Sequence, residues 1–190
     1  MIMTYYYKLA NTFVFIPIFI LSFFGSSVLY SENLKIDLLL EELKAPAERN
    51  SKEVERDIWV EWSKSGSIKL DTLLQRGRSF MADKKFNNAI NIFDKVINEK
   101  PTFAEAWNAR ATAYYLQGQF DKSISDINKV LSLNPNHFGA LAGLGSILEI
   151  LGYFEAAREA LKKANEINPN NKNIKKSLER VNEKAADASL

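Results

Sequence analysis

Residues 104–137, AEAWNARATAYYLQGQFDKSISDINKVLSLNPNH, are one copy of a unit that the chain contains three times. A phenylalanine in the middle of the unit and a proline at its end recur at one constant spacing. The copies are Phe86, Phe120, Phe154, Pro101, Pro135 and Pro169. A fixed period of about 20–50 residues is typical of arrays whose neighbouring units share one elongated core, and such arrays usually bind other proteins. The period therefore predicts a binding scaffold.

Each unit has the pattern of a helical hairpin. In the middle copy, hydrophobic residues recur every three or four positions from Trp107 to Tyr114, which places them on one face of a helix. Gly118 interrupts this pattern, and a second stripe of the same kind runs on to Pro135. The predicted units are residues 70–103, 104–137 and 138–171.

These units resemble the tetratricopeptide repeat (TPR) family, whose signature orders tryptophan, leucine-glycine, tyrosine, alanine, phenylalanine and proline. The likeness is carried by Trp107, Ala111, Tyr114, Ile127, Pro135, Leu144, Gly145, Ala157, Leu161 and Pro169. It covers residues 70–171 and implies an all-α fold, an α-solenoid of three helical hairpins. Arg76 and Arg110 depart from the signature at the usual leucine position, and Ser123 departs where a small alanine is expected.

Helical segments are predicted on both sides of the repeats. Repeat arrays expose an apolar face at each end, so polar-backed caps are expected. We assign residues 31–69 to an N-terminal helical cap region and residues 172–190 to a capping helix and tail. Trp59 and Trp62 share one helical face and are interpreted as packing against the first repeat. The alternative is an exposed anchor for a partner, because tryptophans dominate binding hot spots.

Residues 1–30 have the composition of an export signal. Lys8 is the only charged residue before Glu32, and the mostly apolar stretch 13–24 is shorter than the roughly 20 residues that a membrane span needs. The alternative extends the apolar run over residues 12–29 and makes it an uncleaved anchor. Both interpretations predict an exported protein. A cleaved signal places it in the bacterial periplasm, and an uncleaved anchor places it on the inner membrane, facing the periplasm.

The composition argues against several kinds of chemistry. The chain has no cysteine, one histidine, and 25 basic against 23 acidic residues. The absence of cysteine excludes disulfides, thiolate metal sites and thiol catalysis. The sequence also has no long basic run of the kind that indicates a nucleic-acid surface. Residues 143–146 lack the spacing of a nucleotide loop or a nucleophile elbow. We predict no enzyme activity, catalytic residue, metal site, cofactor or nucleic-acid partner; a helical hydrolase behind the repeats is a distant alternative.

The single histidine, His137, is predicted to be structural or solvated. It follows Pro135 at a turn, where Asn136 is a plausible cap for the next helix. The sequence places no second histidine, no cysteine and no cluster of carboxylates with it, so a catalytic or metal role has no support.

A second stripe on each first helix faces away from the core and supplies the candidate site. The resemblance places this stripe on the inner, concave wall of the array. The candidate groove residues are Arg78, Met81, Asn108, Thr112, Tyr115, Gly139, Gly143 and Ser146. An ordinary solvated helix face is the alternative interpretation. Gly139 and Gly143 leave this wall bare, either for the backbone of a partner or for another segment of the chain.

Related clamps that hold a terminal carboxylate carry basic and asparagine residues along this groove. The third unit has Gly139 and Gly143 instead, so the resemblance does not extend to that clamp.

Two arginines in the repeats are expected to behave differently. Arg110 and Asp126 lie in the two helices of one hairpin and are predicted to form an internal ion pair, with a ligand contact as the alternative. Arg76 has Ile92 where the acid would be, and is therefore expected to be the freer of the two.

The residues and the resemblance together predict a non-catalytic interaction scaffold or adaptor of the cell envelope. Its partner is expected to be a protein or peptide bound in the concave groove. Membrane contact is expected only through residues 1–30, if these are not cleaved. The alternative is a membrane-tethered assembly factor or chaperone.

Overall fold

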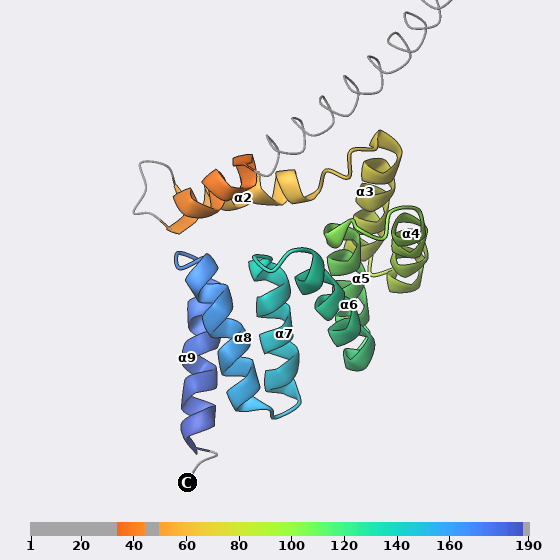
Figure 1. Ribbon diagram of the computed structural model, residues 1–190. Coiled ribbons are helices and arrows are strands. Elements are labelled where there is room, and N and C mark those ends of the chain that lie inside the picture. The colour runs from red at the N-terminus through yellow and green to blue at the C-terminus, as the bar shows by residue number, and fades with distance from the viewer. Residues whose placement is uncertain (1–33, 45–49, 188–190) are drawn as a thin grey trace, which may run out of the picture. The chain divides into compact units, whose positions relative to one another are not determined.

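The computed structural model describes residues 34–44 and 50–187, and all regular secondary structure in these ranges is α-helical. Residues 34–44 are helical. The remaining helices (Figure 1) are α2 (Ser51–Trp62), α3 (Ile68–Ala82), α4 (Phe86–Glu99), α5 (Ala104–Leu116), α6 (Phe120–Leu133), α7 (Phe138–Ile150), α8 (Phe154–Ile167) and α9 (Lys172–Asp187). The chain divides into two units between Leu39 and Leu40, and α2 to α9 belong to the second.

The predicted export segment, residues 1–30, lies outside the described residues. Within residues 34–44 and 50–187, no helix combines the length and the hydrophobicity that crossing a membrane requires.

The six helices from α3 to α8 pair as three hairpins, which confirms the predicted solenoid. Each helix contacts its neighbour in sequence, and the first helices of successive hairpins, α3, α5 and α7, also contact one another. The hairpin turns need one residue in the left-handed backbone conformation, with φ of 71° at Gly118 and 82° at Gly152. The first hairpin uses Lys84 (φ 59°) at the equivalent position.

The two helices of each hairpin pack closely because a small residue faces a large one. A Cβ atom at Gly145 would lie 2.5 Å from Cγ of Leu161, and one at Gly77 would clash with the ring of Phe93. In the middle hairpin, Ala111 belongs to the same core cluster as Ile127. Glycine at position 145 therefore allows the two helices of the third hairpin to pack closely.

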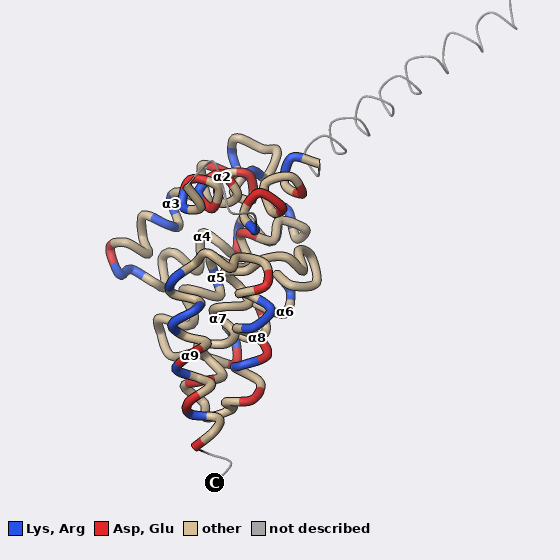
Figure 2. The backbone as a smooth tube through the Cα atoms, turned by 90° about the vertical axis from the view of Figure 1, so that its left-hand side faces the viewer, with Lys and Arg blue, Asp and Glu red and all other residues tan. Residues whose placement is uncertain are grey.

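Helix α9 covers the open end of the third hairpin, as expected of a capping helix. Val181 is fully buried and clusters with Ala157 and Leu161 of α8. On its polar side, Arg180 donates two hydrogen bonds of 2.7 Å to Glu149 of α7, and Lys184 adds one of 2.8 Å. The charged residues in the first half of this helix are all lysines, and acidic and basic residues alternate from Glu179 to Asp187 (Figure 2).

Helix α2 packs on the third repeat, which corrects the prediction that its tryptophans cover the first. The Trp62 ring stacks on His137 with centroids 4.4 Å apart, and Trp59 meets the ring of Phe138 edge-on at 5.5 Å. Glu55 also accepts a 2.9 Å hydrogen bond from Asn168 beyond α8. The repeat period describes contacts between neighbouring units, so it carries no information on which repeat a flanking helix reaches.

Candidate binding groove between α5 and α7

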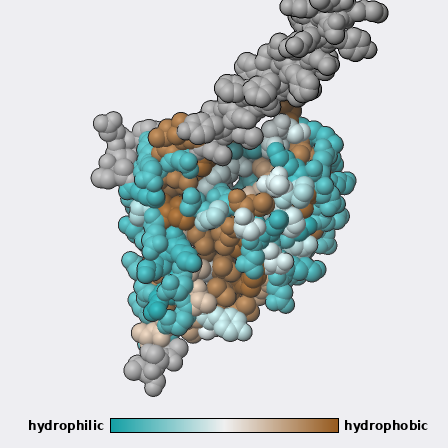
Figure 3. All heavy atoms as spheres, viewed as in Figure 1, coloured by the Kyte–Doolittle hydropathy of each residue, from teal (hydrophilic) through white to brown (hydrophobic). Residues whose placement is uncertain are grey.

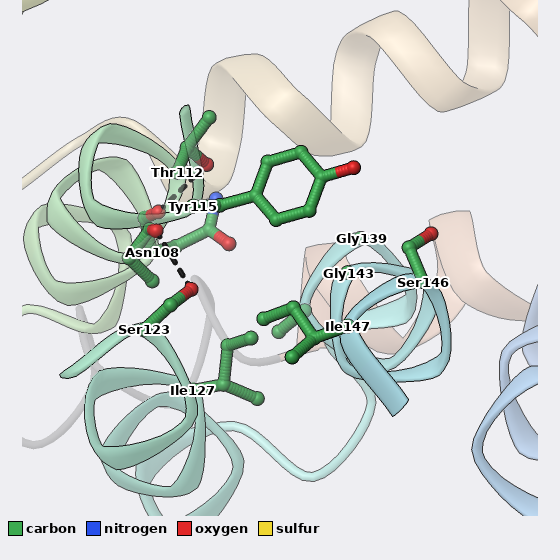
Figure 4. A pocket seen from close by; sticks show the side chains of 11 residues that line it. Asn108, Thr112, Tyr115, Ser123, Ile127, Gly139, Gly143, Ser146 and Ile147 are labelled. Carbon is green, nitrogen blue, oxygen red and sulfur yellow. Dashed lines mark hydrogen bonds between the residues drawn. The ribbon is translucent and has the colours of Figure 1, made fainter. Parts of the chain in front are cut away.

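A cavity of about 230 Å³ lies between α5 and α7 and is also bordered by α6 (Figure 4). Its lining is uncharged and consists of Asn108, Ala111, Thr112, Tyr115, Ser123, Ile127, Gly139, Ala140, Gly143, Ser146 and Ile147. Six of the eight predicted groove residues line it: Asn108, Thr112, Tyr115, Gly139, Gly143 and Ser146.

Small residues on α5 and α7 create this space. A Cβ atom at Gly143 would make only one ordinary contact, 3.8 Å from Cδ1 of Ile127. Glycine is therefore not needed there for packing between helices, and its missing side chain leaves the cavity open. Ile127 and Ile147 are buried and form the apolar floor, while the Tyr115 ring extends from α5 toward α7 (Figure 4).

Gly139 has a different role, because another segment of the chain occupies the space beside it. A Cβ atom at this position would lie 2.6 Å from Cη2 of Trp59. Of the two alternatives for the bare wall, contact with the chain's own segment therefore holds at Gly139. Trp59 of α2 thus stands at the end of the cavity that Gly139 lines.

Three hydroxyl groups that line the cavity, those of Thr112, Ser146 and Ser123, direct their protons into the protein. Thr112 donates to the carbonyl of Asn108 at 3.0 Å, and Ser146 donates to the carbonyl of Ala142 at 3.0 Å. In the same way, Ser123 donates to the carbonyl of Ala111 at 2.8 Å. A hydroxyl has one proton and two lone pairs. These groups therefore present hydrogen-bond acceptors to the cavity.

The other two predicted groove residues, Arg78 and Met81, do not line the cavity. Arg78 donates hydrogen bonds of 2.6 Å to Glu105 and 3.1 Å to Ser63, and its side chain is 34% exposed. Met81 is half-buried and packs against the core of the first hairpin.

A buried polar network that the sequence did not reveal supports the start of α7. His137 is fully buried, and its Nδ1 accepts the N–H of Ala140 at 3.0 Å. Its other nitrogen, Nε2, therefore carries the proton and donates to buried Glu105 at 3.1 Å. His137, and not Asn136 as expected, is the N-cap of α7. The two partners are 32 residues apart in sequence, and no local pattern indicates that they meet.

The predicted ion pair between Arg110 and Asp126 is present, away from the cavity. Arg110 donates two hydrogen bonds to Asp126, at 2.8 and 2.7 Å, and a third of 2.5 Å to Asp94, which the sequence did not indicate. The hydrogen bonds to Asp126 are the main reason that the pKa of Arg110 is raised above its usual value. Arg76 is exposed and lies over the ring of Phe80, at 5.8 Å from its centroid.

Comparison with known proteins identifies the repeats. Three family models, each described as tetratricopeptide repeat, match residues 71–102, 104–137 and 138–171, together more than half of the chain. A TPR repeat-containing protein of Rhizobium etli is 32% identical over 89 residues, which are 46% of this chain and 44% of that protein. The chain thus spans less than half the length of this relative.

Solved structures share the architecture. The Sgt2 TPR domain from Aspergillus fumigatus matches with a TM-score of 0.62 and 26% identity, over 65% of this chain and 83% of that one. The first TPR domain of Spaghetti (RPAP3), solved with the HSP90 peptide SRMEEVD, matches with a TM-score of 0.60 and 24% identity, over 62% and 94%. The type III secretion chaperone SycD of Yersinia enterocolitica, solved with a peptide of YopD, matches with a TM-score of 0.59 and 16% identity, over 63% and 96%.

The last two likenesses, at 24% and 16% identity, concern the fold alone. With three matched repeats and the hairpin packing described above, the chain belongs to the tetratricopeptide repeat family.

Proposed function

We propose that this protein is a non-catalytic scaffold or adaptor that binds a protein or peptide segment in the cavity between α5 and α7. The observation that carries the proposal is the cavity itself, which has an apolar floor and a polar rim and is left open by Gly143. Such a combination is typical of binding sites. The peptide complexes of the Spaghetti domain and of SycD support a peptide ligand for this fold.

Our proposed setting is the cell envelope, after export. The support is the sequence of residues 1–30, with its single charged residue and its apolar stretch. The second candidate function, a membrane-tethered assembly factor or chaperone, is favoured by the longer apolar run over residues 12–29. Mass spectrometry of the mature protein distinguishes the two, because peptides from residues 5–24 remain only if the segment is not cleaved.

Photo-crosslinking tests the groove assignment. The photoreactive residue p-benzoylphenylalanine replaces Tyr115 at the cavity or, as a matched control, Tyr153, which is 62% exposed in the turn before α8. We expect position 115 to crosslink a discrete partner, and we expect Gly143→Leu to abolish that crosslink by filling the cavity. A partner captured from position 115 equally well with and without Gly143→Leu would contradict binding in the cavity.

A further inference from the structure

We infer that the ligand of this cavity is an extended, uncharged peptide segment that inserts one aliphatic side chain between α5 and α7 and offers backbone N–H groups to the rim. This inference rests on the proposed function and specifies the chemistry of the ligand. It follows from the size of the cavity, the direction of its hydrogen-bonding groups and the charges around it.

The size of the cavity suits a single side chain. Its volume of about 230 Å³ lies below the roughly 300–1,000 Å³ that small-molecule sites occupy. The floor is aliphatic, with Ile127 and Ile147 directed into the space (Figure 4). An aliphatic side chain fills this space without leaving a polar group buried and unpaired.

The rim suits a peptide backbone. Thr112 and Ser146 direct their protons to helix carbonyls, so their oxygens accept hydrogen bonds from a ligand. A peptide in extended conformation presents N–H groups to such acceptors and places alternate side chains toward the floor. The side-chain amide of Asn108 is directed to Glu105, at 3.3 Å, and is engaged there.

The surrounding charges disfavour an acidic ligand. None of the residues that line the cavity is charged. The nearby cation Arg78 and the Nε2–H of His137 both donate to Glu105, so these donors are already engaged. A carboxylate in the cavity would lose its hydration without gaining a counter-charge, which is unfavourable. The same cost applies to an ammonium group, because the Glu105 carboxylate is itself paired.

An exposed apolar side chain lies near the end of each of the two helices, α5 and α7. Leu116 directly follows Tyr115 and is 49% exposed, and Ile150 lies one turn beyond Ile147 and is 55% exposed. Hydrophobic residues gather over α7 in the surface view (Figure 3). Ile150, one turn beyond the cavity-lining Ile147 on α7, therefore offers a bound segment a second apolar contact.

Peptide selection against the full-length protein tests this inference. Random dodecapeptides displayed on phage are selected, and the affinities of the resulting synthetic peptides are measured by fluorescence anisotropy. Each peptide is measured with the native chain, with Gly143→Leu, which fills the cavity, and with Thr112→Val, which removes a rim acceptor. Ser125→Leu adds the same side chain at an exposed position of α6 outside the cavity and is the matched control. Circular dichroism verifies that the variants are folded.

The expected result is a set of uncharged peptides that share an aliphatic residue. Gly143→Leu should weaken their binding at least tenfold, Thr112→Val about threefold to tenfold, and Ser125→Leu less than twofold. The acidic peptide SRMEEVD, used as a defined probe, should bind at least tenfold more weakly than they do.

Other results separate the ligand chemistry from the proposed function. If binding depends on Gly143 but requires an acidic or basic residue of the peptide, the uncharged ligand is wrong and the groove function stands. Unchanged affinity for Thr112→Val would overturn the backbone contact at the rim. If no selected peptide is sensitive to Gly143→Leu, both the ligand class and the groove function are overturned.

Discussion

Arg110 occupies a position where the family signature has a leucine, and its contacts explain how a charge is accommodated there. The guanidinium meets both oxygens of Asp126 in the other helix of its hairpin and reaches Asp94 in the preceding hairpin. It also lies over the Trp107 ring, 4.8 Å from the centroid. Paired acceptors and an aromatic face compensate the loss of hydration of an arginine.

Asp126→Asn should destabilise the protein by about 3 kcal/mol, because it leaves a largely buried arginine without its main counter-charge. The measurement is the free energy of unfolding in urea. Asp94→Asn is the control: this carboxylate is 40% exposed, against 5% for Asp126, and its loss should cost less than about 1 kcal/mol. Equal losses for the two variants would contradict the central role of Asp126.

Glu149 makes the stability of the cap depend on pH. Hydrogen bonds from Arg180, followed by those from Lys184, lower the pKa of this carboxyl to about 2. In the unfolded chain a glutamate titrates near 4.3. The ionised Glu149 carboxylate therefore makes its full contribution to the free energy of unfolding above roughly pH 5. This contribution is lost as the pH falls from about 4.5 toward 2.

Glu149→Gln should lower the free energy of unfolding by about 1 kcal/mol at pH 7, because Arg180 and Lys184 are themselves half exposed. At pH 2, where about half of the Glu149 carboxyl in the folded chain is protonated, most of this difference should be gone. Urea unfolding at both values measures the difference. Glu155→Gln, in an exposed pair with Arg158, should change stability by at most a few tenths of a kcal/mol at either pH, as is usual for surface pairs. A difference between Glu149→Gln and the native chain that is as large at pH 2 as at pH 7 would show that the lost charge is not its cause.

Among the elements, the three hairpin turns are equivalent in backbone but not in sequence. Gly118 and Gly152 adopt the left-handed conformation without steric cost, whereas Lys84 adopts it with a side chain present. The cost of that conformation is about 1–2 kcal/mol for residues other than glycine. The first turn is therefore the strained one of the three.

Lys84→Gly should stabilise the protein by roughly 0.5–1 kcal/mol, since the relief of strain is partly offset by the greater freedom of glycine in the unfolded chain. Thermal unfolding detects this as a rise in Tm of about 1–4 °C. Lys85→Gly, one residue further on and not in the left-handed conformation, is the control and should not stabilise. A lower Tm for Lys84→Gly would mean that the lysine side chain makes a contribution larger than the strain.

For the molecule as a whole, the repeats were predictable from the sequence and the long-range contacts were not. The hairpins, the turn glycines and the Arg110–Asp126 pair follow from patterns within a single repeat unit, because repeated units meet their neighbours in the same way. For the same reason, six of the eight predicted groove residues line the cavity. The position of α2 and the bond between Glu105 and His137 depend on side chains that are distant in sequence, and no periodicity records them.

Trp62→Ala should release α2 while leaving the repeats folded, since the Trp62 ring is stacked directly on His137. Hydrogen–deuterium exchange followed by mass spectrometry measures the effect. We expect peptides from α2 to exchange at least tenfold faster and peptides from α4 and α6 to be unchanged. Val60→Ala on the exposed side of α2 is the control (51% exposed). Faster exchange throughout α3 to α8 would show that α2 is part of one cooperative unit with the repeats.

The attachment of α2 also bears on the order in which the protein folds. Glu55 of α2 accepts hydrogen bonds from Asn168 and Asn171, which lie 113 and 116 residues further along the chain, whereas the hairpins form from local contacts. Local contacts form early and distant ones late, because closing a long loop is costly in entropy. We therefore expect α2 to be synthesised before the repeats and to dock only after α7 to α9 are in place. Until then, the inner face of a newly made chain lies open.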